Sequence, residues 1–521
     1  MKQQDFFKGA SVLAFAGLIT KFIGALYRIP LTNIVGAEAI GMYQLVFSVY
    51  ALFLTSSTGG LPTALSKLIA ETRASGGSEK EIGRISGSAL GLVGITGLVF
   101  TALLMIFSRQ IAAFQGNAQI YSAYIVIAPA IFFVSIISVM RGWFQGQINM
   151  TPTALSQIIE QLFKLGAGLT LSAIMVKKGL INGAIGALLG VVISEFIAAG
   201  YLYILFLKHG GKLEVARSYK ELTKDFKRVA KYALPITIGG VLMPLTQFID
   251  SFLVVNLLNK IGFALNLSTS LYGILTGPVS SLINFPVVIT ISLAVVIIPV
   301  VSRKKAERNI SEILSKSNFA VKTALFIGIP AAILFIVFSE EIVALLYPNF
   351  DAYETANAAR LLMLSSVGIV FLAVMQIFTA LLQALDKIIL PIRNMALAML
   401  IKIILNLTLI PAIGIYGAAV ATVAAYFTAA ALDYISLSRH IGFSKKTLFA
   451  VLKTLTAGAI AAGFIFLTKS VIQNPYLKLF VTAALALILY TLLTVFTGLF
   501  TDDELRSLPL GKFLLKLKGA A

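Results

Sequence analysis

Long apolar segments separated by short polar ones run along the whole chain. We count fourteen of them, near residues 9–34, 39–69, 82–107, 119–147, 152–177, 181–207, 231–258, 267–301, 313–339, 355–384, 388–410, 413–438, 446–470 and 476–500. A helix needs about 20 apolar residues to cross the hydrocarbon core of a bilayer, and these segments reach that length. The pattern predicts an all-α polytopic membrane protein with about 14 transmembrane helices.

The composition agrees with this prediction and restricts the function. Of the 521 residues, 58% are hydrophobic and only 12% are charged, and the mean hydropathy is +0.93. Soluble domains are far more polar. The two longest polar stretches, near residues 208–231 and 501–521, are too short for a catalytic domain, so we expect the protein to work inside the bilayer. The absence of cysteine excludes disulfides and thiolate metal sites.

The 42 basic and 22 acidic residues give a net charge of +20. The basic residues gather at alternate helix ends, with roughly thirty of them on the side of the N-terminus, as the positive-inside rule describes for cytoplasmic ends. This placement predicts that both termini are cytoplasmic. It argues against a nucleic-acid partner, which would need one basic folded face. Because the first apolar segment continues through Lys21 and Arg28, it indicates a retained helix and not a signal peptide.

The chain repeats itself with an offset of 238 or 239 residues. Three pairs of residues follow that offset in order: Gln145 and Gln383, Pro152 and Pro391, Lys164 and Lys402. Six helices separate matching positions, an even number, so the two copies point the same way and form a parallel repeat. We predict a first lobe at residues 1–230 with six helices and a basic loop, and a second six-helix lobe at residues 231–440. Two C-terminal helices and a basic tail follow at residues 441–521.

A polar face marks the fifth helix, inside the stretch RGWFQGQINMTPTALSQIIEQLFK at residues 141–164. The helix is predicted to begin at Pro152, because proline suits a first turn. Four polar residues then follow at spacings of three and four, and therefore share one face: Gln157, Glu160, Gln161 and Lys164. A charge at the bilayer centre costs roughly 2.5–3.5 kcal/mol on insertion scales, so this face should meet a partner or a polar cavity. A Glu160–Lys164 pair would offset part of that cost; the alternative is that both side chains extend to the interface.

Five further ionisable residues lie inside apolar segments: Lys21, Arg28, Glu195, Asp250 and Lys402. Lys21 and Arg28 share a face of the first helix and cannot neutralise each other. They need a carboxylate from the same lobe or an anion, and arginine suits phosphate because its fork binds two oxygens. Two alternatives stay open: Arg28 is an interfacial anchor, and Glu195 is a buried partner of Lys164.

Glycine and proline interrupt two helices at matching places in the two lobes. We predict hinges at Gly60 and Pro62 in the second helix, and at Pro278 and Pro286 in the eighth. Proline removes a helix hydrogen bond and kinks the axis. The alternative is that these are ordinary prolines of membrane helices, which are frequent.

Catalytic motifs are absent from the sequence. It contains no GxxxxGK phosphate loop and no HExxH zinc motif, and only two histidines occur. We therefore expect a transporter and not an enzyme, with no cofactor and no metal site.

Three stretches, at residues 141–164, 277–303 and 406–422, resemble the polysaccharide-flippase branch of the MOP superfamily. Within it, the chain is similar to the stage V sporulation protein B type and to the MurJ-type lipid II flippases. The resemblance implies two six-helix lobes around a central cavity, two extra C-terminal helices and alternating access. It implies a substrate, an undecaprenyl-pyrophosphate-linked sugar that moves from the inner to the outer leaflet of a bacterial plasma membrane. It also suggests cell-wall synthesis enzymes as partners of a monomeric protein.

A lipid-linked pyrophosphate sugar needs cations, polar amides and an apolar groove for its tail. Three residues supply the cations: Lys21, Arg28 and Lys164. The sugar would be bound by amides and neighbouring carboxylates, namely Gln145, Gln157, Glu160, Gln161, Glu195 and Asn284. Further arginines of MurJ-type proteins fall on Tyr27 and Ser281 in this chain, so a lipid-linked sugar other than lipid II stays an alternative.

The resemblance also implies an ion site in the second lobe. The positions that match the ligands of sodium-binding relatives are Asp250, Lys402, Asn406 and Thr422. Lys402 stands where a neutral ligand would be, and an ammonium group donates only. We therefore predict an internal Asp250–Lys402 ion pair and flipping that does not depend on sodium. The alternative is that Lys402 extends to the cytoplasmic end.

Two other functions stay open. A multidrug or organic-cation antiporter of the same superfamily would favour an acidic, aromatic-rich cavity. A membrane-embedded glycosyltransferase or polymerase would need large external loops, which the pattern does not contain.

Overall fold

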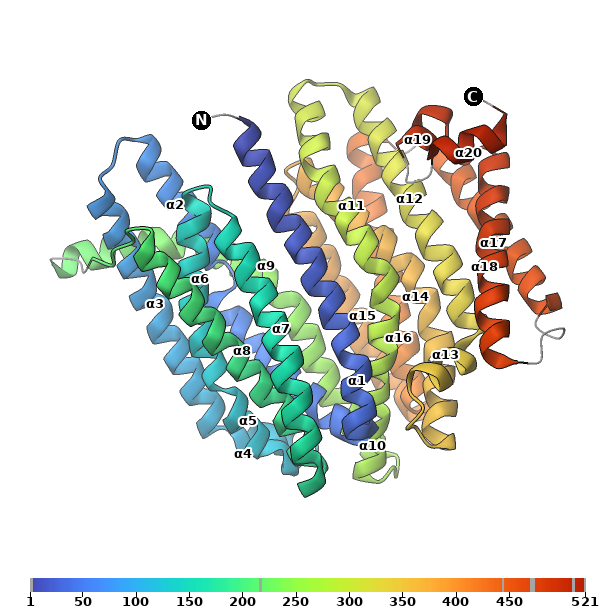
Figure 1. Cartoon of the computed structure of the whole chain (residues 1–521), viewed down its shortest axis with the longest axis horizontal. Coiled ribbons are helices and arrows are strands. Elements are labelled where there is room, and N and C mark those ends of the chain that lie inside the picture. Colours follow the sequence, from blue (N-terminus) through green and yellow to red (C-terminus); the bar gives the residue numbers. More distant parts are fainter. Residues whose placement is uncertain (1–2, 215–217, 443–444, 469–473, 508–510, 520–521) are drawn as a thin grey trace. The chain divides into compact units, whose positions relative to one another are not determined.

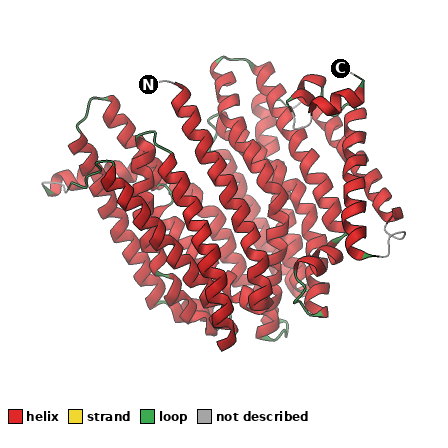
Figure 2. Cartoon of the chain, viewed as in Figure 1, coloured by secondary structure: helices red, strands yellow, loops and turns green. Residues whose placement is uncertain are grey.

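The computed structural model describes residues 3–214, 218–442, 445–468, 474–507 and 511–519, and this part of the chain is helical without a strand (Figure 2). Thirteen of its helical stretches are long and apolar enough to cross a membrane. The predicted all-α membrane architecture is therefore confirmed.

The longest helix, α1 (Gln3–Thr58), contains two crossings. Gly36 divides it with φ 82° and ψ 171°, a backbone conformation that glycine adopts without the steric cost of a Cβ atom. A straight helix of its 56 residues would be about 84 Å long, more than twice the thickness of a hydrocarbon core. The chain instead returns, and α2 (Leu61–Ala74) lies at the end of the first unit where the chain begins (Figure 1). Thirteen stretches, the first with two crossings, give the predicted fourteen.

The chain forms two compact units, Met1–Gly277 and Pro278–Ala521. The first contains α1, α2, α3 (Glu79–Ile106), α4 (Ser108–Phe114), α5 (Tyr121–Ile127), α6 (Pro129–Gly146), α7 (Thr151–Met175), α8 (Leu180–Lys208), α9 (Tyr219–Lys260) and α10 (Leu265–Ile274). The second contains α11 (Ser280–Ala306), α12 (Ile310–Val337), α13 (Ser339–Leu346), α14 (Ala352–Ala384), α15 (Ile389–Ile413), α16 (Ile415–Ile441), α17 (Lys445–Thr468), α18 (Pro475–Phe496), α19 (Asp502–Arg506) and α20 (Gly511–Lys518). The lobe boundaries near residues 230 and 440 stay a prediction.

An apolar core joins α2, α3, α6 and α8 in the first unit. Trp143 packs edge to face on Phe144 and Phe206, with ring centroids 4.9 and 4.7 Å apart. Trp143 and Phe144 belong to the stretch that the sequence singled out, and the ring contacts fix the end of α6 against α8. Such aromatic pairs contribute roughly 0.5–1.5 kcal/mol beyond the area that they bury.

The core of the second unit joins α11, α12, α14, α16, α17 and α18, with Leu381 and Tyr490 among its buried side chains. Lys322 of α12 and Glu504 of α19 form an ion pair at 2.9 Å. This contact ties the short helix after α18 back to α12. The two C-terminal membrane helices that the sequence predicted are thus present as α17 and α18.

One helix pair in each unit shows a similar local construction. In each pair the second helix follows the first almost directly, and a glycine of the second helix lies against the backbone of the first. Gly186 of α8 leaves no room for a Cβ atom next to Ser172 of α7, and Gly417 of α16 leaves none next to Leu409 of α15. The same close helix pairing therefore occurs once in each unit.

The predicted hinge residues differ in their local structure. Gly60 lies between α1, which ends at Thr58, and α2, whose first turn contains Pro62. Pro278 lies in η3 (Leu275–Val279), a π-helical turn. Pro286 is buried inside α11, which continues past it to Ala306. Motion at these positions stays a prediction.

Candidate functional site

A polar cluster in the first unit is built from α6, α7, α8 and α1. The link from α6 to α7 contains Ile148 with φ 61°, a left-handed conformation that turns the chain sharply. Arg141 near the end of α6 then faces the first turns of α7. Its Nε donates to Ser156 Oγ at 3.0 Å, and its Nη2 lies 3.1 Å from Glu160 Oε2.

The expected Glu160–Lys164 pair is wrong. Both oxygens of Glu160 are engaged elsewhere, one by Arg141 and the other by the amide of Gln161 at 3.1 Å. The guanidinium fork satisfies a hydroxyl and a carboxylate at once, which an ammonium on the neighbouring helical turn cannot do. Arg141 was missed as a site residue because it lies near the end of an apolar segment, where a basic residue usually marks the interface.

Lys164 faces aromatic rings of α1. Its Nζ lies 5.8 Å from the centroid of Tyr27 and 5.3 Å from that of Phe47, the geometry of cation–π contacts. It makes no ion pair with a carboxylate in the described part of the chain. Gln161 lies against Gly24 of α1, so this part of the polar face of α7 is directed at α1. The ammonium group is thus held by rings and keeps its capacity to bind an anion.

Glu195 of α8 is 7% exposed. The charges that act on it are those of Glu160, Arg141 and Lys164, so the structure brings these four residues together. Neither a hydrogen bond nor an ion pair joins Glu195 to another described residue, and it is therefore not the ion-pair partner of Lys164. The buried hydroxyls of Tyr27 and Tyr50 also have no hydrogen-bond partner among the residues described. Buried polar groups are rarely left unpaired, so this cluster has capacity for a polar ligand or water.

The other predicted binding residues lie around this cluster or apart from it. Gln145 is half-buried on α6 one turn after Arg141, and Gln157 is half-buried on α7. Lys21 is exposed on α1. Asn284 is exposed in the second unit, where its amide donates to the Ser280 carbonyl at 2.7 Å. Their roles in binding stay a prediction.

Arg28 contacts the start of η3. Its Nη1 donates to the Thr276 carbonyl at 3.3 Å, and Gln44 Nε2 donates to the same oxygen at 2.6 Å. α1 and α10 also approach closely. A Cβ atom at Gly41 of α1 would collide with the backbone of Thr269, and one at Gly273 of α10 would collide with the carbonyl of Ala37. We call these contacts of α1 with Thr269, Gly273 and Thr276 the α1–α10 seam. Asn117 Nδ2 adds a hydrogen bond to Thr269 Oγ1 at 3.2 Å.

The predicted ion-site residues belong to both units, with Asp250 in the first and the other three in the second. Lys402 and Asn406 are buried one turn apart on α15, and the hydroxyl of Thr422 donates to the Ala418 carbonyl on α16 at 2.9 Å. Asp250 lies on α9 of the first unit. The Asp250–Lys402 pair stays a prediction.

A buried polar network in the second unit was not predicted. Asp433 of α16 is 2% exposed, and it accepts hydrogen bonds from Thr379 and Asn394, both at 2.8 Å. Asn394 also donates to Ser436 at 3.1 Å. Because the carboxylate lies five residues before the end of the apolar segment at 413–438, its position in the sequence resembled that of a helix-end charge. No group of three or more histidine, aspartate or glutamate residues suited to a metal occurs among the described residues.

The fold and this cluster define a polytopic helical membrane transporter. The sequence matches the polysaccharide biosynthesis protein family over residues 6–305 and the MatE family over residues 235–408. Since the first match covers more than half of it, the chain belongs to the polysaccharide biosynthesis protein family, and the predicted membership of the MOP superfamily is confirmed.

Individual relatives agree with this assignment. Stage V sporulation protein B of Bacillus subtilis (strain 168) is 27% identical over 99% of this chain and 100% of its own length. Lipid II flippase MurJ of the same organism is 27% identical over 85% of this chain and 84% of its own. Two solved structures share the fold. An inward closed conformation of lipid II flippase MurJ has a TM-score of 0.73 at 18% identity, covering 93% of this chain and 98% of that one. An inward-facing multidrug resistance MATE family transporter has a TM-score of 0.66 at 16% sequence identity, and the match covers 81% of this chain and 94% of that one.

We expect Arg141 and Glu160 to stabilise the first unit as a pair. Arg141→Gln or Glu160→Gln alone leaves a partly buried charge unpaired, and should lower the free energy of unfolding by about 1–3 kcal/mol. The double variant should lose clearly less than the sum. Thermal unfolding in detergent measures all three. Glu71→Gln is the control, since its exposed pair with Lys67 at 3.8 Å should contribute under about 1 kcal/mol. Additive losses would contradict the pairing.

Proposed function

We propose that the protein is a flippase for an undecaprenyl-pyrophosphate-linked sugar, lipid II or a polysaccharide precursor, working by alternating access. It would act as a monomer in a bacterial plasma membrane with both termini cytoplasmic, and cell-wall synthesis enzymes would supply and use its substrate. The observation that carries this proposal is the polar cluster of α6, α7 and α8, in which Lys164 makes no ion pair with a carboxylate of the described residues. The family match and the named roles of the relatives support it.

The cluster offers complementary groups for such a head group. Lys164 would bind the pyrophosphate, and Lys21 would approach it from α1. The amides of Gln157 and Gln161 and the carboxylate of Glu195 can exchange hydrogen bonds with sugar hydroxyls. Arg141 would act indirectly, because its fork holds Glu160 and Ser156 in place.

An apolar groove of about 410 Å³ between α1 and α7 suits the polyprenyl tail. Its walls are Val12, Phe15, Ala16, Ile19, Thr151, Ala154, Leu155 and Ile158. Both helices continue from the groove to Gly24 and Gln161, which lie side by side next to the cluster. A tail in this groove would therefore be continuous with a head group at Lys164.

The α1–α10 seam would be a gate. It joins α1 from the first sequence repeat to α10 from the second, and alternating access requires contacts between the repeats to break. Glycine contacts suit this purpose because backbones that touch through small residues separate without leaving large apolar side chains exposed. Arg28 would then serve the gate and not the phosphate.

A second candidate, an organic-cation antiporter, has one observation in its favour. The rings of Tyr27 and Phe47 already hold one ammonium group, that of Lys164, and Tyr50 is close enough to the buried Glu195 to be influenced by its charge, so the surroundings suit a cation. Under this function, expression in a strain without efflux pumps would lower ethidium accumulation, and depletion would leave lipid-linked precursors at their normal level.

Lys164→Gln should reduce transport of a fluorescent lipid-linked sugar into the outer leaflet of vesicles roughly tenfold or more, because a charge-assisted phosphate contact is lost. Lys21→Gln should have a smaller effect in the same direction. Lys178→Gln, an exposed lysine just after α7, removes the same charge outside the cluster and should leave the rate unchanged. Full activity of Lys164→Gln would exclude the proposed phosphate site.

Cross-linking Thr269 of the seam to Asn117, its hydrogen-bond partner just before η1 (Ala118–Ile120), should stop transport, because it would hold α10 in place at the seam. The chain has no cysteine, so Asn117→Cys with Thr269→Cys introduces a single thiol pair where the native side chains lie 3.2 Å apart. We expect the oxidised protein to be inactive and the reduced protein to recover, whereas each single variant should be insensitive to oxidant. If transport persists after complete cross-linking, the seam does not open.

Transport should not depend on sodium if Lys402 occupies the ion site as a built-in cation. Replacing sodium with choline in both vesicle compartments should change the rate less than twofold. Lys402→Asn should create sodium dependence when the site geometry is retained. A strong loss of wild-type activity in choline would exclude the built-in cation.

A further inference from the structure

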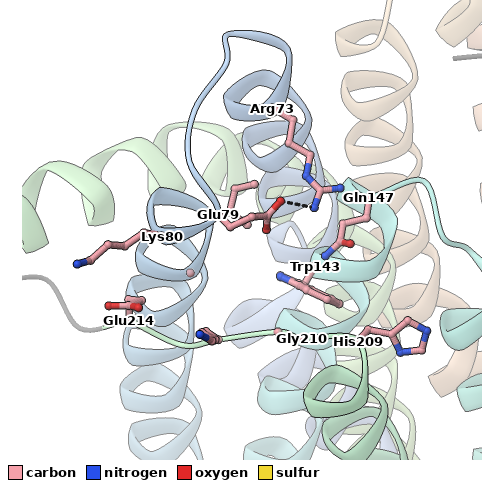
Figure 3. A pocket seen from close by; sticks show the side chains of 12 residues that line it. Arg73, Glu79, Lys80, Trp143, Gln147, His209, Gly210 and Glu214 are labelled. Atoms are coloured by element: carbon pink, nitrogen blue, oxygen red, sulfur yellow. Dashed lines mark hydrogen bonds and ion pairs between the residues drawn. The ribbon is translucent and has the colours of Figure 1, made fainter.

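A cavity of about 570 Å³ lies in the first unit where α2, α6 and α8 end and α3 begins (Figure 3). Two of its lining residues, Trp143 and Gln147, come from the stretch at residues 141–164. Trp143 follows Arg141 by two residues on α6, so the two side chains leave the helix in different directions. The cavity is therefore distinct from the polar cluster that faces α7.

The walls of this cavity are firmly held. Trp143 is fixed by its contacts with Phe144 and Phe206. The segment after α8 is attached to α3 at two places. The Glu214 amide donates to the Gly83 carbonyl at 3.1 Å, and the Glu214 backbone lies so close to Gly87 that a Cβ atom there would collide with it. The cavity is thus pre-formed, and its size lies within the roughly 300–1,000 Å³ of small-molecule sites.

The polar groups of the cavity are mainly donors. Arg73 binds Glu79 at 2.7 Å and keeps further N–H groups for a ligand (Figure 3). Gln147 Nε2 is buried and has no hydrogen-bond partner among the described residues. Lys80 and Lys212 make no ion pair with another residue that the structure describes.

The cavity has more positive than negative charge. The lining contains three cations and two carboxylates: Arg73 pairs with Glu79, which leaves Lys80, Lys212 and Glu214 without an ion pair among the described residues. A single net positive charge with several N–H donors matches a phosphate ester. The carboxylates Glu79 and Glu214 can accept hydrogen bonds from hydroxyl groups, which a phosphate alone would not use.

We propose that this cavity binds a phosphate ester that carries hydroxyl groups. The phosphate contacts Lys212, Arg73 and the Gln147 amide, and the hydroxyls contact Glu79 or Glu214. Two sources share this chemistry: the head group of an anionic glycerol-bearing lipid, and a soluble phosphate ester.

The single tryptophan of the chain makes the proposal directly testable. Trp143 is that tryptophan and lines the cavity, so all tryptophan emission of the protein comes from a residue at this site. The full-length protein in detergent is titrated with glycerol 1-phosphate. The protein in nanodiscs is compared between phosphatidylglycerol and phosphatidylcholine. A saturable change with glycerol 1-phosphate identifies a soluble ester, and a change only with phosphatidylglycerol identifies a lipid head group; either supports the proposal.

Matched variants separate a built site from general attraction of anions. Lys212→Gln should weaken the apparent affinity roughly tenfold, and Gln147→Leu should weaken it without changing the charge. Lys208→Gln removes the same charge four residues earlier, outside the cavity, and should stay within about twofold of the parent. The proposal is overturned if neither probe gives a saturable change, or if Lys208→Gln weakens binding as much as Lys212→Gln.

Discussion

A charge within a bilayer must be met by another polar group, and the first unit is arranged around this constraint. The bond from Arg141 to Glu160 joins two consecutive helices across a four-residue link. Because that bond occupies the carboxylate, Lys164 on the next turn is left to aromatic rings. The ion pair between α6 and α7 thus determines which cation of the cluster can bind a ligand. Arg141 is occupied by Glu160, whereas Lys164 is not paired with a carboxylate.

Close backbone contact is the second constraint. Association of membrane helices depends on packing and hydrogen bonds, since lipid tails are as apolar as leucine side chains. Small residues bring α1 against α10 and α7 against α8, and at such contacts side-chain amides reach backbone carbonyls, as Gln44 does at Thr276. The polar groups and the glycines therefore act together, the glycines setting the distance and the amides fixing the register.

The number and position of the membrane helices could be predicted because apolar length is a local property of the sequence. The polar face of α7 was predictable for the same reason, since helix periodicity alone places Gln161 and Lys164 together. The partner of Glu160 was not, because it depends on how the link at Ile148 orients α6 relative to α7. Likewise Arg28 meets a carbonyl in a π-helical turn, and neither the turn nor its distance from α1 is marked by residue type.

The single-residue reversal at Gly36 has a consequence for biogenesis. Most membrane helices are joined by loops that let one span enter the bilayer before the next. Here Gly36 alone separates the first two helical segments, and the chain reverses there, so the outer ends of both segments lie at the same end of the first unit (Figure 1). Because a single residue joins them, we expect the two segments to insert as one hairpin, and we expect a residue with a Cβ atom at position 36 to impede insertion, since it would have to adopt φ 82°.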